Sequence, residues 1–471
     1  MPMPSDRDER NLARMGYTQE LLRRLGGFSS FAIGFSVISV LTGVTSTFGD
    51  AIGAGGAAGL GLGWPLVSAG TLVVAIAMAE LASAFPTAGA LYHWSALLGG
   101  ASLGWATAML NLVGQIAIVA AIDLACAQAL AQTLGRPALA YGLFVGILAA
   151  HGMLSATSVR LVAWLNDASA TVHVVGVAVL AALLFWRGRA QDASALIVPT
   201  APARGFVQSL VLGVWTFTGF DAAAHVSEET RDPGRRAPMG ILSSVAVSAL
   251  AGYALVATLV LATPDPASLA GAPDAALKVL RAAAGVRAGS FAMGLVIVAM
   301  WFAGLSSVTS ASRMLFAFAR DRGLPWADLL RRVHPRTRTP LYATAACVLA
   351  PLALVAATAP LSDTVFLAVA ALATIALYAS YALPIALGAA ARVRGRWTRR
   401  GPWSVGRAGV PFAIAAVAWT LFVFIVCALA NRLAMEIFGA LLVALAALWL
   451  GYVRARFRGP PIDLAHFEHP E

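Results

Sequence analysis

Apolar residues in this chain are grouped into long runs that short polar, charged or Pro- and Gly-rich segments separate. A bilayer core about 30 Å thick needs roughly 20 apolar residues to cross it as an α-helix. Twelve runs meet this requirement, and we expect each of them to form one transmembrane helix. They comprise residues 25–49, 64–84, 103–131, 138–156, 161–186, 206–227, 239–262, 290–319, 341–359, 365–390, 410–430 and 435–453. The pattern predicts an all-α polytopic membrane protein with twelve transmembrane helices.

The runs divide the chain into five parts. A polar segment (1–24) precedes ten helices (25–390), an Arg-rich loop (391–409) leads to two additional helices (410–453), and a polar tail (454–471) follows. The first apolar run is too long and too rich in Gly for a cleaved signal peptide, so we expect the N-terminal segment to be retained.

Composition supports a membrane protein. Hydrophobic residues make up 59% of the chain, charged residues 12%, and the mean hydropathy is +0.78, values that a soluble globular protein does not reach. The net charge of +11 does not indicate nucleic-acid binding, because the basic residues lie in short loops between apolar runs. Cys126, Cys347 and Cys427 lie inside apolar runs without CxxC spacing, so neither a disulfide, a metal site nor a cofactor is expected.

The positions of Lys and Arg predict the orientation, since cytoplasmic loops carry the excess of basic residues. With a cytoplasmic N-terminus, twelve spans place only eight of the 33 basic residues outside. These eight are Arg136, Arg187, Arg189, Arg204, Lys278, Arg281, Arg287 and Arg432. We therefore expect a multi-pass protein of the inner (cytoplasmic) membrane with both termini in the cytoplasm.

Two runs contain a Gly beside a hydroxyl residue at mid-depth, at Thr42-Gly43-Val44 in the first and Thr218-Gly219-Phe220 in the sixth. The two positions correspond five helices apart, as expected for an inverted-repeat transporter whose helices 1 and 6 unwind at the binding site. Freed N–H groups suit a carboxylate and freed carbonyls suit an ammonium group, so a zwitterionic amino acid fits both. Alternatively, each Gly serves close helix packing.

Four stretches carry a resemblance to a known family. They are residues 34–44 (GFSVISVLTGV), 78–92 (MAELASAFPTAGALY), 215–222 (WTFTGFDA) and 318–325 (FARDRGLP). In order and spacing, the chain resembles the amino acid/polyamine/organocation superfamily, and within it the amino acid/choline transporter branch. The resemblance implies a five-plus-five inverted repeat with broken helices 1 and 6, to which helices 11 and 12 are appended.

The resemblance also implies the substrate site. In similar transporters the first break holds the substrate carboxylate and the sixth receives the amino group, while an aromatic residue packs over the substrate. The corresponding residues here are Ile38, Ser39, Thr42, Gly43 and Val44 in helix 1, and Trp215, Thr216, Phe217, Thr218, Gly219 and Phe220 in helix 6. Trp215 is the matching aromatic, although a lipid-facing or core Trp is the alternative.

Acidic residues inside the membrane are costly and therefore indicate function. Asp221 matches an acidic position of the family, which implies gating or a response to protons, unless it only caps the half-helix that restarts there. Glu80 matches the acid of helix 2 in the family. A role in transport chemistry and a structural bond to the neighbouring loop are the two alternatives for it. Glu228 and Glu229 precede several arginines and form either an inner-gate ion network or a solvated loop.

His173 in helix 5 is a candidate for proton coupling, because an imidazole titrates near neutral pH. Some relatives have a helix-5 Lys that substitutes for sodium, but the only lysine here is Lys278 in an outer loop. The alternative is a neutral His173 bonded to a neighbouring helix. In helix 8, the hydroxyls of Ser306 and Ser307 suit either a cation site or helix packing.

These features predict a secondary transporter of a small amino acid or related amine, driven by protons or by a counter-substrate. The sequence has no P-loop for ATP-driven pumping and no paired nucleophile and base or HExxH motif for an enzyme. A non-transporting amino-acid sensor on the same fold is the alternative.

Overall fold

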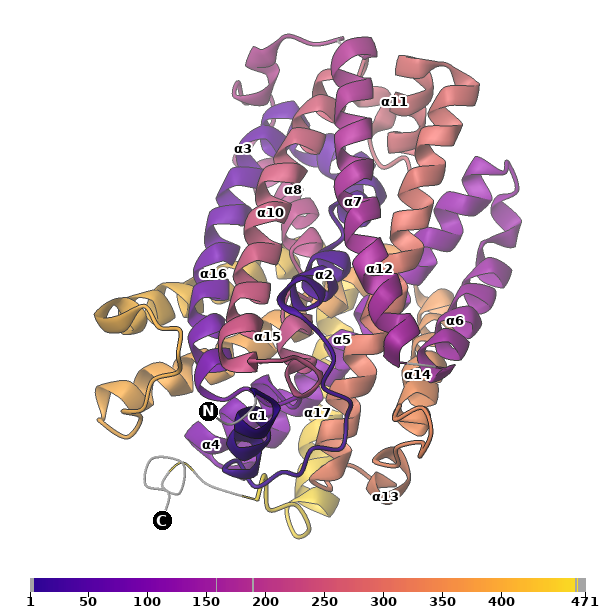
Figure 1. Ribbon diagram of the computed structural model, residues 1–471. Coiled ribbons are helices and arrows are strands. Elements are labelled where there is room, and N and C mark those ends of the chain that lie inside the picture. The colour runs from indigo at the N-terminus through magenta and orange to yellow at the C-terminus, as the bar shows by residue number, and fades with distance from the viewer. Residues whose placement is uncertain (1–3, 158, 189, 462–463, 465–471) are drawn as a thin grey trace.

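The computed structural model describes residues 4–157, 159–188, 190–461 and 464, and these residues are predominantly helical (Figure 1). The longer helices are α1 (Pro4–Ala13), α2 (Gly27–Ile38), α3 (Val40–Ala84), α4 (Leu91–Gly99), α5 (Ala101–Thr133), α6 (Ala140–Thr157), α7 (Val159–Arg187), α8 (Ala203–Thr216), α10 (Pro233–Leu261), α11 (Ala275–Ala284), α12 (Val286–Arg320), α14 (Leu341–Thr358), α15 (Val365–Val393), α16 (Gly409–Ala430) and α17 (Arg432–Leu448). Two four-residue helices, α9 (Ala222–His225) and α13 (Ala327–Leu330), complete the α-helices. Arg189 and most of the predicted C-terminal tail lie outside the described residues.

Ten segments of the described chain are long and apolar enough to cross a membrane. One of them is the 58-residue stretch Gly27–Ala84, in which a kink at Gly56 (φ 64°, ψ −168°) replaces the expected gap between the first two runs. The sixth run is divided between α8 and α9, and each of these helices alone is too short to cross a membrane. An all-α polytopic membrane protein is thereby confirmed, whereas the number twelve stays a prediction.

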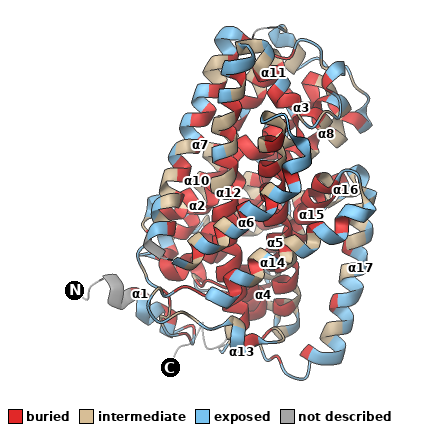
Figure 2. Ribbon diagram, turned by 90° about the vertical axis from the view of Figure 1, so that its right-hand side faces the viewer, coloured by how far each residue is buried: buried red, intermediate tan, exposed pale blue. Residues whose placement is uncertain are grey.

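The core lies around α5 and α15, the two most deeply buried spans, and α17 lies at the periphery (Figure 2). Large apolar side chains such as Phe291, Leu421 and Val443 are exposed on the outer helices. Apolar surface of this extent would be unfavourable in water and is suited to contact with lipid.

The two faces of the molecule differ in what covers them. We call the face that carries α1 and α4 the N-terminal face; α11 lies at the opposite end (Figure 1). Phe457, beyond α17, packs against Tyr92 of α4 at 6.2 Å between ring centroids, so this part of the C-terminal region also lies at the N-terminal face.

Candidate functional site

The first break lies at Ser39, between α2 and α3. Ser39 has φ 39° and ψ 76°, in the left-handed region, and α3 begins at Val40. The Ser39 hydroxyl accepts a hydrogen bond from the Thr42 N–H (3.3 Å), and the Ser39 carbonyl accepts one from the Gly43 N–H (2.9 Å). Serine is a favoured N-terminal cap because its side-chain oxygen satisfies an N–H group that the helix leaves free.

The break therefore precedes its predicted position at residues 42–44, which lie in the first turns of α3. The physical reason is the cap, since Ser39 takes up two of the three N–H groups that were expected to be free. Val40 and Leu41 are the residues at this helix start whose N–H groups have no partner among the described residues.

The second break spans residues 217–221, between α8 and α9, and includes the predicted Thr218-Gly219-Phe220. Gly219 has φ 81°, a conformation that glycine adopts without the steric cost other residues pay. Its N–H group donates to the Tyr381 hydroxyl of α15 (3.2 Å).

The two breaks lie against each other. A Cβ atom built on Gly43 would lie 2.6 Å from the Thr216 Cβ, closer than real Cβ contacts allow. A Cβ atom on Gly219 would likewise meet the Val37 side chain. Both glycines are therefore required for the close approach of the two broken helices. Because of this approach, the substrate-binding residues predicted in the first run lie next to those predicted in the sixth.

Asp221 is the polar centre of the second break. Its side chain is fully buried, and its Oδ1 atom accepts a hydrogen bond from the Tyr381 hydroxyl (2.8 Å). The Oδ2 atom accepts hydrogen bonds from Asn111 Nδ2 (3.0 Å) and Gln115 Nε2 (3.3 Å), both on α5. Asp221 makes no capping bond to α9, so the capping alternative is not what the structure shows.

His225 is a buried residue of this centre that the sequence analysis missed. Its Nε2 atom lies 3.1 Å from Asp221 Oδ2, and its Nδ1 atom lies 3.1 Å from the carbonyl oxygen of Ala88, in the segment between α3 and α4. The spacing of four residues between Asp221 and His225 is the signal that could have revealed the pair, because such residues share one face of a helix.

His173 contacts the first break instead. Its Nδ1 atom lies 2.8 Å from the Ser169 carbonyl, which can only accept a hydrogen bond, so Nδ1 carries a hydrogen. Its Nε2 atom lies 2.7 Å from the Ser39 hydroxyl, which is able to donate. A neutral His173 therefore satisfies both contacts.

Ser306 and Ser307, predicted in the eighth run, lie on α12 and differ in their partners. Ser306 donates to Asn166 Oδ1 of α7 (2.6 Å), and Ser307 donates to the Ala303 carbonyl of its own helix (2.9 Å). Among the described residues no group of three His, Cys, Asp or Glu side chains is arranged to hold a metal ion.

Glu228 and Glu229 form buried ion pairs with α12 rather than with the arginines that follow them in the sequence. Both Glu228 carboxylate oxygens accept hydrogen bonds from Arg320 (2.8 and 3.0 Å), and Glu229 Oε1 accepts one from Arg313 (2.7 Å). Burial alone would raise the pKa of Glu228, but the charge and hydrogen bonds of Arg320 outweigh burial and lower it. We call these two ion pairs the inner closure.

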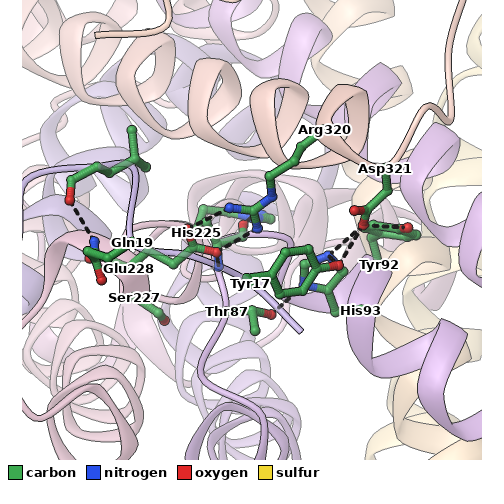
Figure 3. Close-up of polar contacts among 12 residues, drawn as sticks. Tyr17, Gln19, Thr87, Tyr92, His93, His225, Ser227, Glu228, Arg320 and Asp321 are labelled. Atoms are coloured by element: carbon green, nitrogen blue, oxygen red, sulfur yellow. Dashed lines mark hydrogen bonds and ion pairs between the residues drawn. The ribbon is translucent and has the colours of Figure 1, made fainter. Parts of the chain in front are cut away.

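The N-terminal segment covers the inner closure (Figure 3). The Tyr17 hydroxyl donates to Asp321 Oδ2 (2.7 Å), and the Arg320 guanidinium lies 4.0 Å from the Tyr17 ring centroid. Gln19 donates to the Glu228 carbonyl (2.9 Å). Burial and the charge of Asp321 raise the pKa of Tyr17 well above its ordinary value, so the hydroxyl remains a donor. Closure at this face thus depends on residues far apart in the sequence.

Glu80 lies apart from the breaks. Its Oε2 atom accepts a hydrogen bond from Arg392 (2.5 Å), and its Oε1 atom accepts one from the Val405 N–H (3.1 Å). These contacts tie α3 to the Arg-rich loop, which is the structural alternative that the sequence left open.

Two cavities lie beyond the breaks, toward the face opposite the inner closure. A cavity of about 450 Å³ is lined by residues that include Ser46, Asp50 and Phe366, together with part of α11. A second, of about 260 Å³, is lined by Asp50 and Trp215. The rings of Trp215 and Phe366 meet edge to face at 6.0 Å.

The other residues predicted to bind substrate are buried at the two breaks. Phe217 packs against Trp64 (5.0 Å between centroids) and Phe220 against Tyr381 (5.1 Å). Among the predicted residues, Trp215 alone lines one of these two cavities, and its indole N–H has no partner in the described part of the chain. The inner closure thus lies on the N-terminal side of the breaks, whereas these two cavities lie on the opposite side. The N-terminal face has cavities of about 260 and 370 Å³ as well, but none of the residues predicted to bind substrate lines them.

Adjacent helix breaks inside an apolar helical bundle define a membrane permease of the broken-helix class. A model of the amino acid permease family matches residues 25–449, and the chain belongs to this family, in the amino acid/polyamine/organocation superfamily. The chain is 34% identical to amino-acid permease BAT1 of Arabidopsis thaliana, with 97% of this chain and 96% of that protein aligned. The BAT1 homolog of Oryza sativa is 33% identical over 98% and 96% of the two chains. The GABA-specific permease of Saccharomyces cerevisiae is 28% identical over 72% of this chain and 65% of its own.

Proposed function

We propose that this amino acid permease is a secondary active transporter that moves a small amino acid or related amine by alternating access. The observation that carries the proposal is the contact between two helix breaks that have the inner closure on one side and the two cavities on the other. Alternating access requires such a site between two gates, of which the inner closure is one.

The chemistry of the breaks supports a zwitterionic or amine substrate. The N–H groups of Val40 and Leu41 begin α3, where the helix dipole favours an anion such as a carboxylate. The carbonyls near residues 216–218, at the end of α8, favour an ammonium group. The names of the relatives, which include amino-acid permeases and a GABA-specific permease, agree with this substrate class.

The proposal includes the orientation and organisation expected from the sequence. The N-terminal face, with Arg313, Arg320 and Arg392, is the cytoplasmic side of the inner membrane, in agreement with the bias of basic residues toward that side. Residues 25–390 form the ten-helix transport core, and α16 and α17 are additions to it.

Transport is driven by protons or by a counter-substrate. Asp221 is the coupling residue best supported by the structure, because it is a buried carboxylate at the substrate site with partners on three helices. His173 acts through Ser39 on the first break. A sensor without transport is not favoured, since the relatives bear the names of permeases.

The test is uptake of a radiolabelled panel of amino acids and amines into proteoliposomes, with imposed proton or sodium gradients and with internal counter-substrate. Accumulation against a concentration gradient is expected for at least one compound. Saturable binding without accumulation or counterflow would show that the chain is not a transporter.

A further inference from the structure

His225 joins the second helix break to the N-terminal face. One ring nitrogen contacts Asp221 at the break, and the other contacts the carbonyl oxygen of Ala88, each at 3.1 Å. All three groups are buried. The two contacts cannot be explained by a neutral imidazole and a carboxylate.

Counting donors shows why. A carbonyl oxygen and a carboxylate oxygen only accept hydrogen bonds, whereas a neutral imidazole has one N–H donor. Both contacts are satisfied only when one additional proton is present, either on the imidazole, which then donates from both nitrogens, or on Asp221. The pair therefore holds one proton more than a neutral imidazole beside an ionised carboxylate.

The surrounding groups place that proton on His225. Asp221 already receives three other hydrogen bonds, from Asn111, Gln115 and Tyr381, and donors of this kind stabilise a carboxylate. Tyr381 is the titratable group that faces the pair from α15, and α5 presents only the two amides.

We infer that the Asp221–His225 pair is a proton-binding site, and that its proton is what allows His225 to hold the break and Ala88 together. When the proton leaves, the single remaining N–H group can serve Asp221 or Ala88 but not both. One of the two contacts is then lost. The inference rests on the proposed transport function for its role, but the proton site itself is a property of the geometry.

Losing one of these contacts affects the inner closure, because Ala88 also bonds to Glu228. The Ala88 N–H group donates to Glu228 Oε1 (3.1 Å), the carboxylate that also binds Arg320 (Figure 3). The protonated pair thus stabilises the closed N-terminal face. Because a ligand favours the state that binds it more tightly, the closed state binds this proton more tightly than the open state. Closure is therefore favoured at low pH and weakened as pH rises.

Amide hydrogen exchange of the full-length protein in nanodiscs tests this. The N–H groups of Leu25 and Arg231 donate to the Glu229 and Leu25 carbonyls, so these bonds join the N-terminal segment to the segment that carries the two glutamates of the inner closure. After correction for the intrinsic exchange rate, their protection should fall about tenfold between pH 5.5 and 8.5, the size of a typical coupling between sites. His225→Gln, which cannot donate from both ends of its side chain to these acceptors, should abolish this difference.

Two controls separate other sources of pH dependence. His93 is a second histidine near the inner closure, and its ring lies 3.1 Å from Asp321, which also binds Tyr17. His93→Gln should keep the difference if the proton is on the Asp221–His225 pair. Tyr381→Phe removes a donor from Asp221, so the carboxylate is a stronger acceptor for the His225 proton, the pair holds that proton more tightly, and the transition should shift to higher pH. A pH difference that persists in His225→Gln, or a wild type without any difference, would overturn the inference.

The outcome is independent of the uptake assay. A His225-dependent pH effect without uptake would retain the proton site and reject transport. Uptake without a pH effect on amide protection would retain transport and reject the proton site.

Discussion

Gly43 and Thr216 set the distance between the two broken helices. Thr216 ends α8, Gly43 lies one turn into α3, and a Cβ atom on the glycine would lie 2.6 Å from the Thr216 Cβ. The substrate-binding backbone groups on either side depend on this contact, since they belong to the two chain segments that it joins.

Gly43→Leu should therefore abolish substrate binding while the protein still folds in the membrane. The added side chain displaces α8 and with it the second break, so we expect at least about a tenfold loss of affinity, or 1.4 kcal/mol. Equilibrium binding of the transported substrate measures this. Gly142→Leu on α6 is the matched control, because a Cβ there meets nothing within 4 Å. Unchanged affinity in Gly43→Leu would remove the substrate site from helix 1.

The inner closure yields a second prediction. Glu228→Gln leaves Arg320 buried without a full counter-charge, and breaking a buried pair in this way typically costs about 3–5 kcal/mol. The cost falls on the closed state, so exchange of the Leu25 and Arg231 amides should rise. Asp328→Asn, which disturbs the exposed pair with Arg331, should leave exchange unchanged. Equal effects of the two substitutions would argue against a gate at Glu228.

Much of this architecture was accessible from the sequence, but the first break was not placed correctly. Gly43 predicts a break at residues 42–44 of the first run, but the cap at Ser39 decides where α3 begins. At the second break glycine was the right signal, because Gly219 requires a positive φ. A break in each of the first and sixth runs is thus predictable from local sequence. In the first run the capping serine, and not the glycine, fixes its position.

The polar partners were beyond the reach of sequence alone. Tyr381 bonds to Asp221 from 160 positions away, and Arg320 pairs with Glu228 from 92 positions away. Arginines follow Glu228 closely in the sequence, but its partner is Arg320, because the fold brings α12 to it. Spacing within one helix could have indicated His225, whereas contacts between helices require the packing.

Substrate choice forms a third prediction. Asp221 is the acidic residue at the breaks, and its oxygens already accept hydrogen bonds from several side chains, so it offers little to a second cationic group. Small neutral amino acids or γ-aminobutyrate should outcompete arginine and glutamate for uptake. A competition series in proteoliposomes measures this order. A series headed by a dicarboxylic amino acid would contradict the proposed site.

The last prediction distinguishes the two buried histidines that contact the breaks. His173 satisfies the Ser169 carbonyl and the Ser39 hydroxyl as a neutral ring, whereas His225 needs an additional proton for its contacts. His173→Ala should therefore weaken substrate affinity, because Ser39 loses the partner that orients it, and preserve the pH profile of uptake. His225→Gln should flatten that profile and leave counterflow exchange largely intact. Uptake between pH 5.5 and 8.5, measured with saturating and subsaturating substrate, separates the two effects. A flattened profile in His173→Ala alone would assign coupling to His173, and sodium-dependent uptake by the wild type would move it to Ser306 and Ser307.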